Sequence, residues 1–432
     1  MPPHLPDRER HPGDARGRSI RASVDALPIA TRIAVYCYLA HILLQEKIAL
    51  SELGVAATLA AAGWAISRRE LRPSFHILYY PLVLYGVVST LSSLVNHSSR
   101  HLFAESALWL KMLIFPAALI LFREVPPLRE LALRAQIIFA TAIAAYGIYQ
   151  YFVLQRQDLE HRITGPSTHV MTYSGLLLPT SLLLVVLAVR RKQSWIYACA
   201  LVVSFALLLT FTRSVWLGWT VAILAVLTVR RPRWLIFAVP ALLFGLTFMP
   251  DSMFGRLVSS FDTRQSSNLD RIRMAEAGLE MIKDHPVFGV GPANVKEMYP
   301  LYRRDDAPRF RPPHLHNNIL QLWAERGIGA VVAYVLLLAL FLRECARGWR
   351  GPAREFAEAG VAITVGLAYA GLFEFNFGDT EVFLLMLELF ALVIASIEAA
   401  QPATNEPELS LVGVRRLAAA LKAVASDRTP NP

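Results

Sequence analysis

Charged residues are scarce in this chain of 432 residues: Asp, Glu, Lys and Arg make up 18% of it, against roughly 25% in ordinary soluble domains. Cysteine is rarer still, with three residues, and no Cys-x-x-Cys or Cys/His spacing indicates a metal site or a disulfide scaffold. A hydrophobic share of 55% and a mean hydropathy of +0.42 exclude a disordered or collagen-like chain. Long uninterrupted apolar runs argue against a soluble enzyme and favour a polytopic membrane protein.

Twelve segments are long and apolar enough to be candidate membrane spans. They cover residues 28–44, 48–66, 75–94, 104–122, 131–154, 169–189, 195–211, 215–229, 234–249, 318–342, 357–375 and 381–398. The sequence therefore predicts an all-α polytopic protein with about 12 transmembrane helices, nine within 28–249 and three within 318–398. Residues 1–27 are expected to form a cytoplasmic tail rather than a cleaved signal peptide, and 399–432 a second cytoplasmic tail.

The net charge of +10 is distributed unevenly between the two sides of the predicted membrane. Five short loops on one side carry 16 Lys and Arg, and the five alternate short loops carry 5. Positive charge marks the cytoplasmic side of short loops, so both termini are predicted to be cytoplasmic. Nucleic acid is not needed as a partner to explain the basic excess.

One long segment, 250–317, falls on the opposite, periplasmic side and is expected to be a loop domain with a function of its own. Part of it has the spacing of an amphipathic helix, with Ser267 and Asn268 as candidate caps. The apolar positions on its face are Leu269, Ile272, Ala275, Leu279 and Ile282. Pro286 is expected to end this helix.

The strongest chemical signal in the sequence is Pro-Pro-His-Leu-His-Asn-Asn, residues 312–318, just before the tenth predicted span. Histidine is the side chain whose ordinary pKa suits proton transfer near neutral pH. We therefore identify His316 as a candidate base, with His314 and Asn317 as neighbours that contact substrate. The alternative is a polar entry to a helix, with no catalytic role.

Arginines on the side where cations are scarce form the second signal. Arg213 lies in a turn between two apolar runs, where an arginine is costly unless it has a function or reaches water by snorkelling. Arg271 lies on the loop helix, on a face of small residues. Further candidates for substrate binding are Arg162, His169, Arg273 and Arg311. The alternative for Arg273 is a solvated surface charge, and for Arg311 a contact with lipid headgroups.

Taken together, these segments resemble the superfamily of O-antigen ligases and O-antigen polymerases. The resemblance rests on His316-Asn317 followed by Gly327, on HPVFGVGPANV at 285–295, and on FTRSVWLGW at 211–219. It covers roughly residues 130–400 and includes the layout of spans with one large late loop. By this resemblance, His316 takes the position of the essential histidine, and Arg213 and Arg271 those of the arginines that bind a diphosphate.

The resemblance implies a glycosyltransferase in the bacterial inner membrane, with its active site on the periplasmic face. The donor is an undecaprenyl-diphosphate-linked glycan, and the acceptor expected here is the lipid A–core of lipopolysaccharide. Such a donor is already activated, and no nucleotide motif lies on the cytoplasmic side, so we expect no cofactor and no metal. In-line attack by the acceptor hydroxyl predicts inversion at the anomeric carbon.

Other functions remain open at this point. An O-antigen polymerase and a protein O-oligosaccharyltransferase share the donor chemistry, and the ligase is favoured because the basic loop could contact a phosphorylated acceptor. A twelve-span secondary transporter is the alternative from a different class. The candidate polar residues gather at one membrane face, which favours a one-sided catalyst.

Overall fold

The computed structural model describes residues 22–96, 107–156, 162–230, 232–236, 254–255, 258–259, 262 and 265–401. Within these ranges the ordered elements are helices, and no strand occurs, so the all-α prediction is confirmed. The helices are α2 (Ile29–Leu44), α3 (Ile48–Ser67), α4 (Tyr79–Val95), α6 (Ile114–Glu124), α7 (Pro126–Phe152), α8 (Val170–Arg191), α9 (Ser194–Leu209), α10 (Arg213–Arg230), α13 (Ser266–Asp284), α14 (Val295–Tyr302), α15 (Asn318–Arg326), α16 (Ile328–Gly348), α17 (Arg354–Ala370) and α18 (Thr380–Ala399), with short 3-10 turns η1 (Pro232–Trp234) and η2 (Asn376–Gly378).

Six helices in this part of the chain, α3, α7, α8, α10, α16 and α18, have the length and apolar composition to cross a membrane. The shorter helices α2, α4 and α9 are also apolar. The predicted spans agree with observed helices over most of their length, with 104–122 appearing as a helix over 107–112 followed by α6. Most of the predicted span at 234–249 lies outside the described residues.

The predicted tenth span, 318–342, is wrong as a single helix, because the chain breaks between α15 and α16. Gly327 has a left-handed φ of 81°, and a Cβ there would lie 1.8 Å from the carbonyl oxygen of Val287. The amide of Val290 donates to the carbonyl of Ala324 at 2.8 Å, and other backbone bonds join the same two segments. The carbonyl groups at the end of α15 thus accept hydrogen bonds from the loop segment 286–291, where a longer helix would have used its own next turn.

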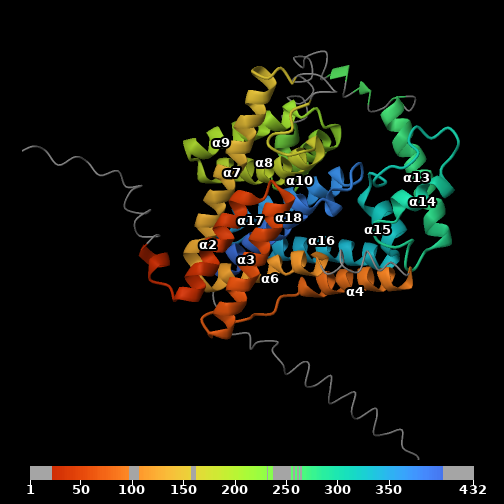
Figure 1. Ribbon diagram of the computed structural model, residues 1–432. Helices are drawn as coiled ribbons and strands as arrows, with labels where there is room; N and C mark the ends of the chain where they lie inside the picture. The colour runs from red at the N-terminus through yellow and green to blue at the C-terminus, as the bar shows by residue number, and fades with distance from the viewer. Residues whose placement is uncertain are drawn as a thin grey trace, which may run out of the picture.

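Helix α18 lies at the centre of the bundle and is buried along nearly its whole length. It packs against α6, α17, α16 and α8, and Figure 1 shows α17 and α18 surrounded by the other helices. A helix that is apolar on all sides, as α18 is over most of its turns, belongs in such a position. The bundle therefore holds both ends of α17 and α18, and the turn between them, in fixed positions.

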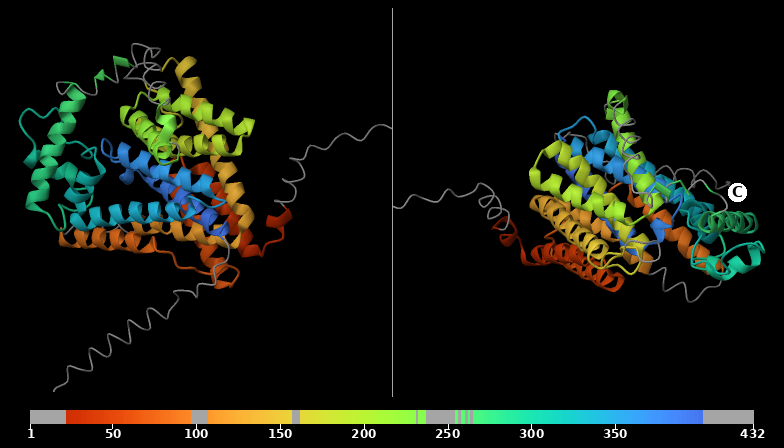
Figure 2. Two further views of the ribbon diagram at one scale, coloured as in Figure 1. Left: turned by 180° about the vertical axis from the view of Figure 1, so that it is seen from behind. Right: turned by 90° about the horizontal axis from the view of Figure 1, so that it is seen from above.

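The loop helices α13, α14 and α15 gather at one end of α16 and α4 (Figure 1). The views from behind and from above in Figure 2 agree with this arrangement. These helices share a small apolar core of their own. Its buried members are Met274, Ala277, Met281, Ile282, Val290, Val295, Tyr299, Leu315 and Ala324. The segment 265–317 is therefore a folded unit.

Helix α13 confirms the predicted loop helix, but two details of that prediction are wrong. The residue before the helix is Gln265, and no side chain caps it, so Ser267 and Asn268 are not caps. Ile272 and Leu279 are exposed, because the side carrying Met274 and Met281 packs against the other loop helices. The buried face of α13 consists largely of Met, Ala and Gly, and these residues gave it a weaker apolar pattern than the exposed face.

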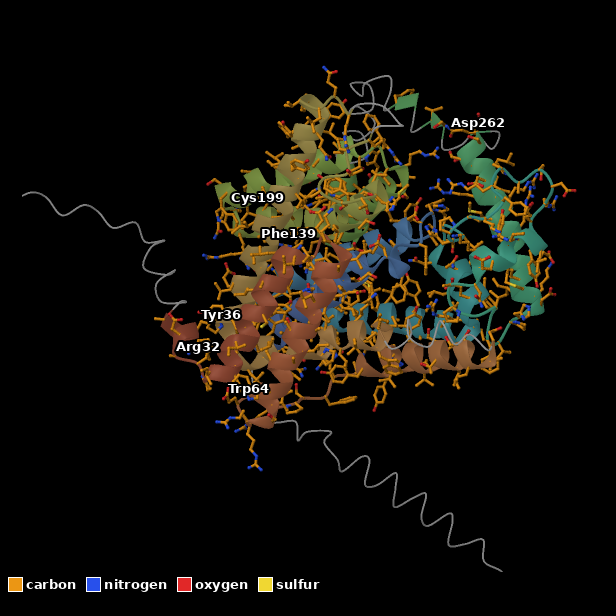
Figure 3. The ribbon with its side chains drawn as sticks, viewed as in Figure 1. Arg32, Tyr36, Trp64, Phe139, Cys199 and Asp262 are labelled. Atoms are coloured by element: carbon orange, nitrogen blue, oxygen red, sulfur yellow. The ribbon has the colours of Figure 1, made fainter. Side chains whose placement is uncertain are left out.

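The opposite end of the molecule carries ion pairs among the arginines of the short loops. Arg123 pairs with Glu398 at 2.6 Å, and Arg191 pairs with Glu355 at 2.8 Å. Figure 3 shows Arg32, Tyr36 and Trp64 at this end and Asp262 at the other, next to α13. The predicted assignment of this end to the cytoplasmic side stays a prediction.

Candidate active site

Arg213 is positioned by the tight turn between α9 and α10. Phe211 in this turn has a left-handed φ of 52°, which reverses the chain, and Arg213 is the first residue of α10. Its side chain is buried, with 7% of its surface exposed. The guanidinium donates hydrogen bonds to Asn268 Oδ1 at 2.8 Å, Gln265 Oε1 at 3.2 Å, and the hydroxyls of Ser259 and Ser267 at 3.3 Å. These bonds tie the start of α10 to the start of α13.

A cavity of about 240 Å³ is lined by residues from both helix starts, and we call it the arginine cavity. Arg162, Arg213 and Arg271 all line it, together with Asn268 and Phe373. Guanidinium groups are planar forks that bind phosphate oxygens two at a time. Three of them around one small space favour a ligand with several negative charges.

Arg271 faces this cavity from the first half of α13. Its Nε is buried, and within the described part of the chain it has no hydrogen-bond partner. Burial lowers the pKa of Arg271, while the negative charges of Glu374 and Asp270 act against that shift. Arginine remains protonated in proteins, so the side chain is a buried cation with a donor left for a ligand.

His316 lies beside Glu374, a residue of the turn after α17. The distance from His316 Nδ1 to Glu374 Oε2 is 2.9 Å, and His314 Nε2 lies 3.5 Å from the other carboxylate oxygen. The centroids of the two histidine rings are 4.2 Å apart. His316 adopts a left-handed φ of 52°, which is strained for a residue with a side chain.

The charges around Glu374 fix the protonation of this cluster. Burial raises the pKa of Glu374, but the hydrogen bond with His316 and the charge of Arg271 outweigh it, and the net pKa is lowered. An ionised carboxylate only accepts hydrogen bonds, so His316 carries its proton on Nδ1. In the neutral form of the ring, Nε2 is then the acceptor nitrogen. Burial lowers the pKa of His314 to about 4, which keeps this second imidazole neutral at neutral pH.

The same three side chains have the composition of a metal-binding set. His314, His316 and Glu374 each offer a ligand atom, and these atoms lie within 4.8 Å of one another. Two histidines and a carboxylate are ligands that zinc accepts. Because Glu374 contacts the His316 ring directly, we interpret the cluster as a hydrogen-bonded base and retain the metal as an alternative to be tested with chelators.

The structure brings five of the predicted site residues to one end of the bundle. Arg162, Arg213 and Arg271 line the arginine cavity, and His314 and His316 flank Glu374. The electrostatic contact between Arg271 and Glu374 links the two groups. The resemblance had assigned roles to three of these residues, and their convergence is a fact about the fold that no single motif contains.

The remaining predicted residues do not line the arginine cavity. His169 is exposed before α8, and Arg311 is exposed 3.7 Å from Glu297. Arg273 pairs with Glu276 at 2.8 Å and with Asp306.

Asn317 is occupied within the fold. It caps α15 by accepting a hydrogen bond from the Leu320 amide at 3.0 Å, and it donates to the carbonyl of Leu372 at 2.9 Å. Its role in this structure is to hold the helix entry next to His316.

Sequence reasoning did not pair Glu374 with His316. The two residues are 58 positions apart, so no local spacing connects them. The available signal was a carboxylate at the outer end of a predicted span, which is costly there without a function. Asn268 was considered only as a helix cap, and the structure uses its side chain to hold Arg213.

The model of the family described as O-Antigen ligase matches residues 197–335. The match includes Arg213, Arg271, His314 and His316, and it ends before Glu374. No curated protein matches the chain. The histidine and the arginines of the motifs lie around one site, and residues 197–335, which hold them, are similar to the O-antigen ligase family.

Proposed function

We propose that this protein is a glycosyltransferase that moves a glycan from an undecaprenyl-diphosphate carrier to the lipid A–core of lipopolysaccharide. The observation that carries the proposal is the arginine cavity beside the His316–Glu374 pair. The arginine cavity suits a diphosphate, and the His316–Glu374 pair suits the removal of a proton. A donor activated as a diphosphate supplies its own driving force, so no nucleotide is required.

The arginines serve the leaving group. As the bond between the anomeric carbon and the diphosphate oxygen breaks, negative charge grows on that oxygen. Arg213 and Arg271 are already fixed in place, Arg213 by its bonds to neutral oxygens and Arg271 by burial on α13. Preorganised cations directed at developing charge are an effective source of rate acceleration.

His316 serves the acceptor. Its Nε2 accepts the proton of the acceptor hydroxyl while the hydroxyl oxygen forms a bond to the anomeric carbon. Glu374 then stabilises the imidazolium through the Nδ1 proton. The carrier diphosphate departs from the opposite side of the carbon, so the anomeric configuration inverts. The proton later leaves His316 for the solvent or the departing diphosphate.

An apolar cavity near the arginine cavity supports a donor with a lipid tail. It measures about 480 Å³ and is lined by residues of α10, α16 and α17. Its lining includes Val221 and Leu372, whereas the arginine cavity is lined by Leu217, one helical turn earlier in α10, and by Phe373. A polyprenyl chain in this second space would place its diphosphate next to Arg213.

This proposal carries an orientation in the membrane. We place the protein in the bacterial inner membrane, with the loop helices on the periplasmic side and both termini in the cytoplasm. Polymerised glycan on its lipid carrier reaches lipopolysaccharide on that side. The excess of Lys and Arg in the short loops at the other end of the bundle supports a cytoplasmic face there.

Transfer by the purified protein tests the proposal. The protein in lipid nanodiscs receives carrier-linked glycan and rough lipopolysaccharide, and the products are separated by size and by lipid anchor. We expect glycan on lipopolysaccharide, with activity retained in EDTA. Longer carrier-linked chains with no lipopolysaccharide product would identify a polymerase, and glycosylated protein an oligosaccharyltransferase. Loss of activity in EDTA that added zinc restores would assign a metal to the histidine cluster.

A further inference from the structure

A second cavity is lined by residues of the same turn after α17 that carries Glu374. It measures about 450 Å³, and we call it the lysine cavity. The two residues that flank Glu374 in sequence divide between the spaces, with Phe373 lining the arginine cavity and Phe375 the lysine cavity. His314, whose ring is 4.2 Å from that of His316, also lines the lysine cavity. His314, beside the candidate base, lines this second cavity, and Arg271, whose charge acts on Glu374, lines the first.

The lysine cavity has a cation that the fold leaves for a ligand. Of its three cations, Lys111 pairs with Glu52 at 2.9 Å and Arg326 pairs with Glu325. Lys296, on α14, is exposed and forms no ion pair with any described residue. Lys296 therefore brings an uncompensated positive charge to a concave surface, which favours an anionic group.

Aromatic side chains form much of the remaining wall. Phe375 is 6.0 Å from the His314 ring, while Phe377 is buried against Tyr85 and Phe383. Phe375 is only partly buried, so its ring is available to a ligand. The apolar face of such a ring suits the C–H surface of a sugar, and the cations around it suit a phosphate.

The basic cluster of the loop, which the sequence suggested as an acceptor contact, is already compensated in the structure. Arg309 lies 2.9 Å from Asp270, and Arg304 lies 3.0 Å from Glu276. Arg273 is held by Asp306. These pairs stabilise the loop unit, and Arg303 of the same cluster donates to the backbone carbonyls of Asp305 and Ala307. Lys296, by contrast, brings its charge to the lysine cavity.

From this placement we infer that the lysine cavity binds the acceptor as a phosphate-bearing saccharide, with Lys296 holding the phosphate. The acceptor hydroxyl then reaches His316 from the side opposite to the diphosphate of the donor. This inference rests on the proposed transferase function and adds a specificity-determining residue to it. The phosphate has two possible sources, a phosphorylated core sugar of lipopolysaccharide or the diphosphate of a second carrier-linked glycan.

The test compares Lys296→Ala with the matched control Lys283→Ala, a lysine on α13 that pairs with Glu280 and lines neither cavity. Initial rates are measured at saturating donor while the acceptor is varied. The acceptors are rough lipopolysaccharide, the same material after enzymatic dephosphorylation, and carrier-linked glycan. For the phosphorylated acceptor that the enzyme uses, we expect Lys296→Ala to raise its KM about tenfold, since a charge-assisted bond is lost, with the donor KM unchanged.

If the core phosphate is the group bound, removing it should raise the acceptor KM of the wild type. That KM should then equal the one that Lys296→Ala shows for phosphorylated lipopolysaccharide. If only carrier-linked glycan depends on Lys296, the diphosphate is the source. Equal acceptor KM values for wild type and Lys296→Ala on every acceptor would overturn the inference.

A binding measurement separates this inference from the proposed function. Phosphorylated and dephosphorylated core saccharides are titrated against His316→Ala protein, with and without Lys296→Ala, by microscale thermophoresis. If binding requires both the phosphate and Lys296 but the wild type transfers no glycan, the acceptor site is supported and the transferase function is rejected. Transfer by the wild type with binding indifferent to Lys296 would support the transferase and reject the cavity.

Discussion

In the proposed mechanism, His316 is the group that accepts the proton and Glu374 is the group that positions it. His316→Ala should lower transfer by roughly 10²- to 10⁴-fold, because general base catalysis is lost, while donor binding persists. Glu374→Gln should lower kcat by a smaller factor and leave the donor KM unchanged, because the imidazole keeps its place and loses its counter-charge.

The measurement is kcat and KM for both substrates, with Glu280→Gln, an exposed residue of α13, as the control. Wild-type turnover in His316→Ala would refute the proposed base. A Glu374→Gln variant that changed only the donor KM would move Glu374 into the diphosphate site.

Arg213 and Arg271 have different surroundings, yet the same substitution tests both. Lysine keeps the charge but has no planar fork, so Arg213→Lys and Arg271→Lys should each raise the donor KM about tenfold or more. Arg213→Lys should also loosen α13, because it loses some of the bonds to Gln265, Ser267 and Asn268. Arg273→Lys is the control, and a donor KM unchanged in all three variants would remove the arginines from diphosphate binding.

His314 predicts how stability depends on pH. Burial lowers its pKa from 6.5 to about 4, so the unfolded chain binds a proton at a pH where the folded protein does not. The stabilisation is complete above about pH 6.5 and is lost as the pH falls towards about 4, by up to about 3 kcal/mol. The pKa of Glu374 is also lowered, so protonation of this carboxylate at a pH below the usual pKa of glutamate removes further stability.

Thermal unfolding in detergent at a series of pH values measures this effect. His314→Asn has no titrating group at that position, so its midpoint should fall less steeply than the wild type between about pH 6.5 and about pH 4.5. Parallel curves for the two proteins would show that His314 is not the titrating residue.

At the scale of single elements, the break between α15 and α16 depends on one glycine. Gly327→Ala places a methyl group 1.8 Å from the Val287 carbonyl and requires a left-handed φ of 81°. We expect a loss of about 2 kcal/mol or more and a loosened segment 286–291, since backbone atoms cannot move away as a side chain can. Gly63→Ala, with open space around it, is the control.

Limited proteolysis of the loop unit together with thermal unfolding would report both effects. Gly327→Ala should be cut faster within 285–295 than the control. Equal cutting rates and midpoints would mean that the break tolerates a side chain, and that the docking of the loop does not depend on Gly327.

The sequence predicted those elements whose bounds depend on neighbouring residues in the chain. The apolar length of α18 and the end of α13 before Pro286 were both readable. The break at Gly327 was not, because the partner that satisfies α15 comes from the segment 286–291. The buried face of α13 was missed for a similar reason, since Met274 and Met281 are buried by α14 and α15.

At the scale of the whole molecule, the site could be predicted only in part. Motif resemblance supplied His316, Arg213 and Arg271 as separate residues. Their convergence depends on α10, α13 and the turn after α17 meeting at one end of the bundle. The lysine cavity is assembled from α14, α15, η2 and the helix at 107–112, and no motif joins these segments. Contacts between distant elements are therefore the part that sequence reading leaves out.

The size of the arginine cavity has a consequence for the length of the glycan. A space of about 240 Å³ has room for a diphosphate and the sugar next to it, but not for a polysaccharide. In the proposed function, the rest of the glycan extends out of this cavity into the periplasm, where we expect it to contribute nothing to recognition. We expect the donor KM to be nearly the same for carriers with one repeat and with many. The length of the glycan is then set by the reactions that build the donor. The proposed enzyme would attach short and long chains in the proportions in which they are supplied.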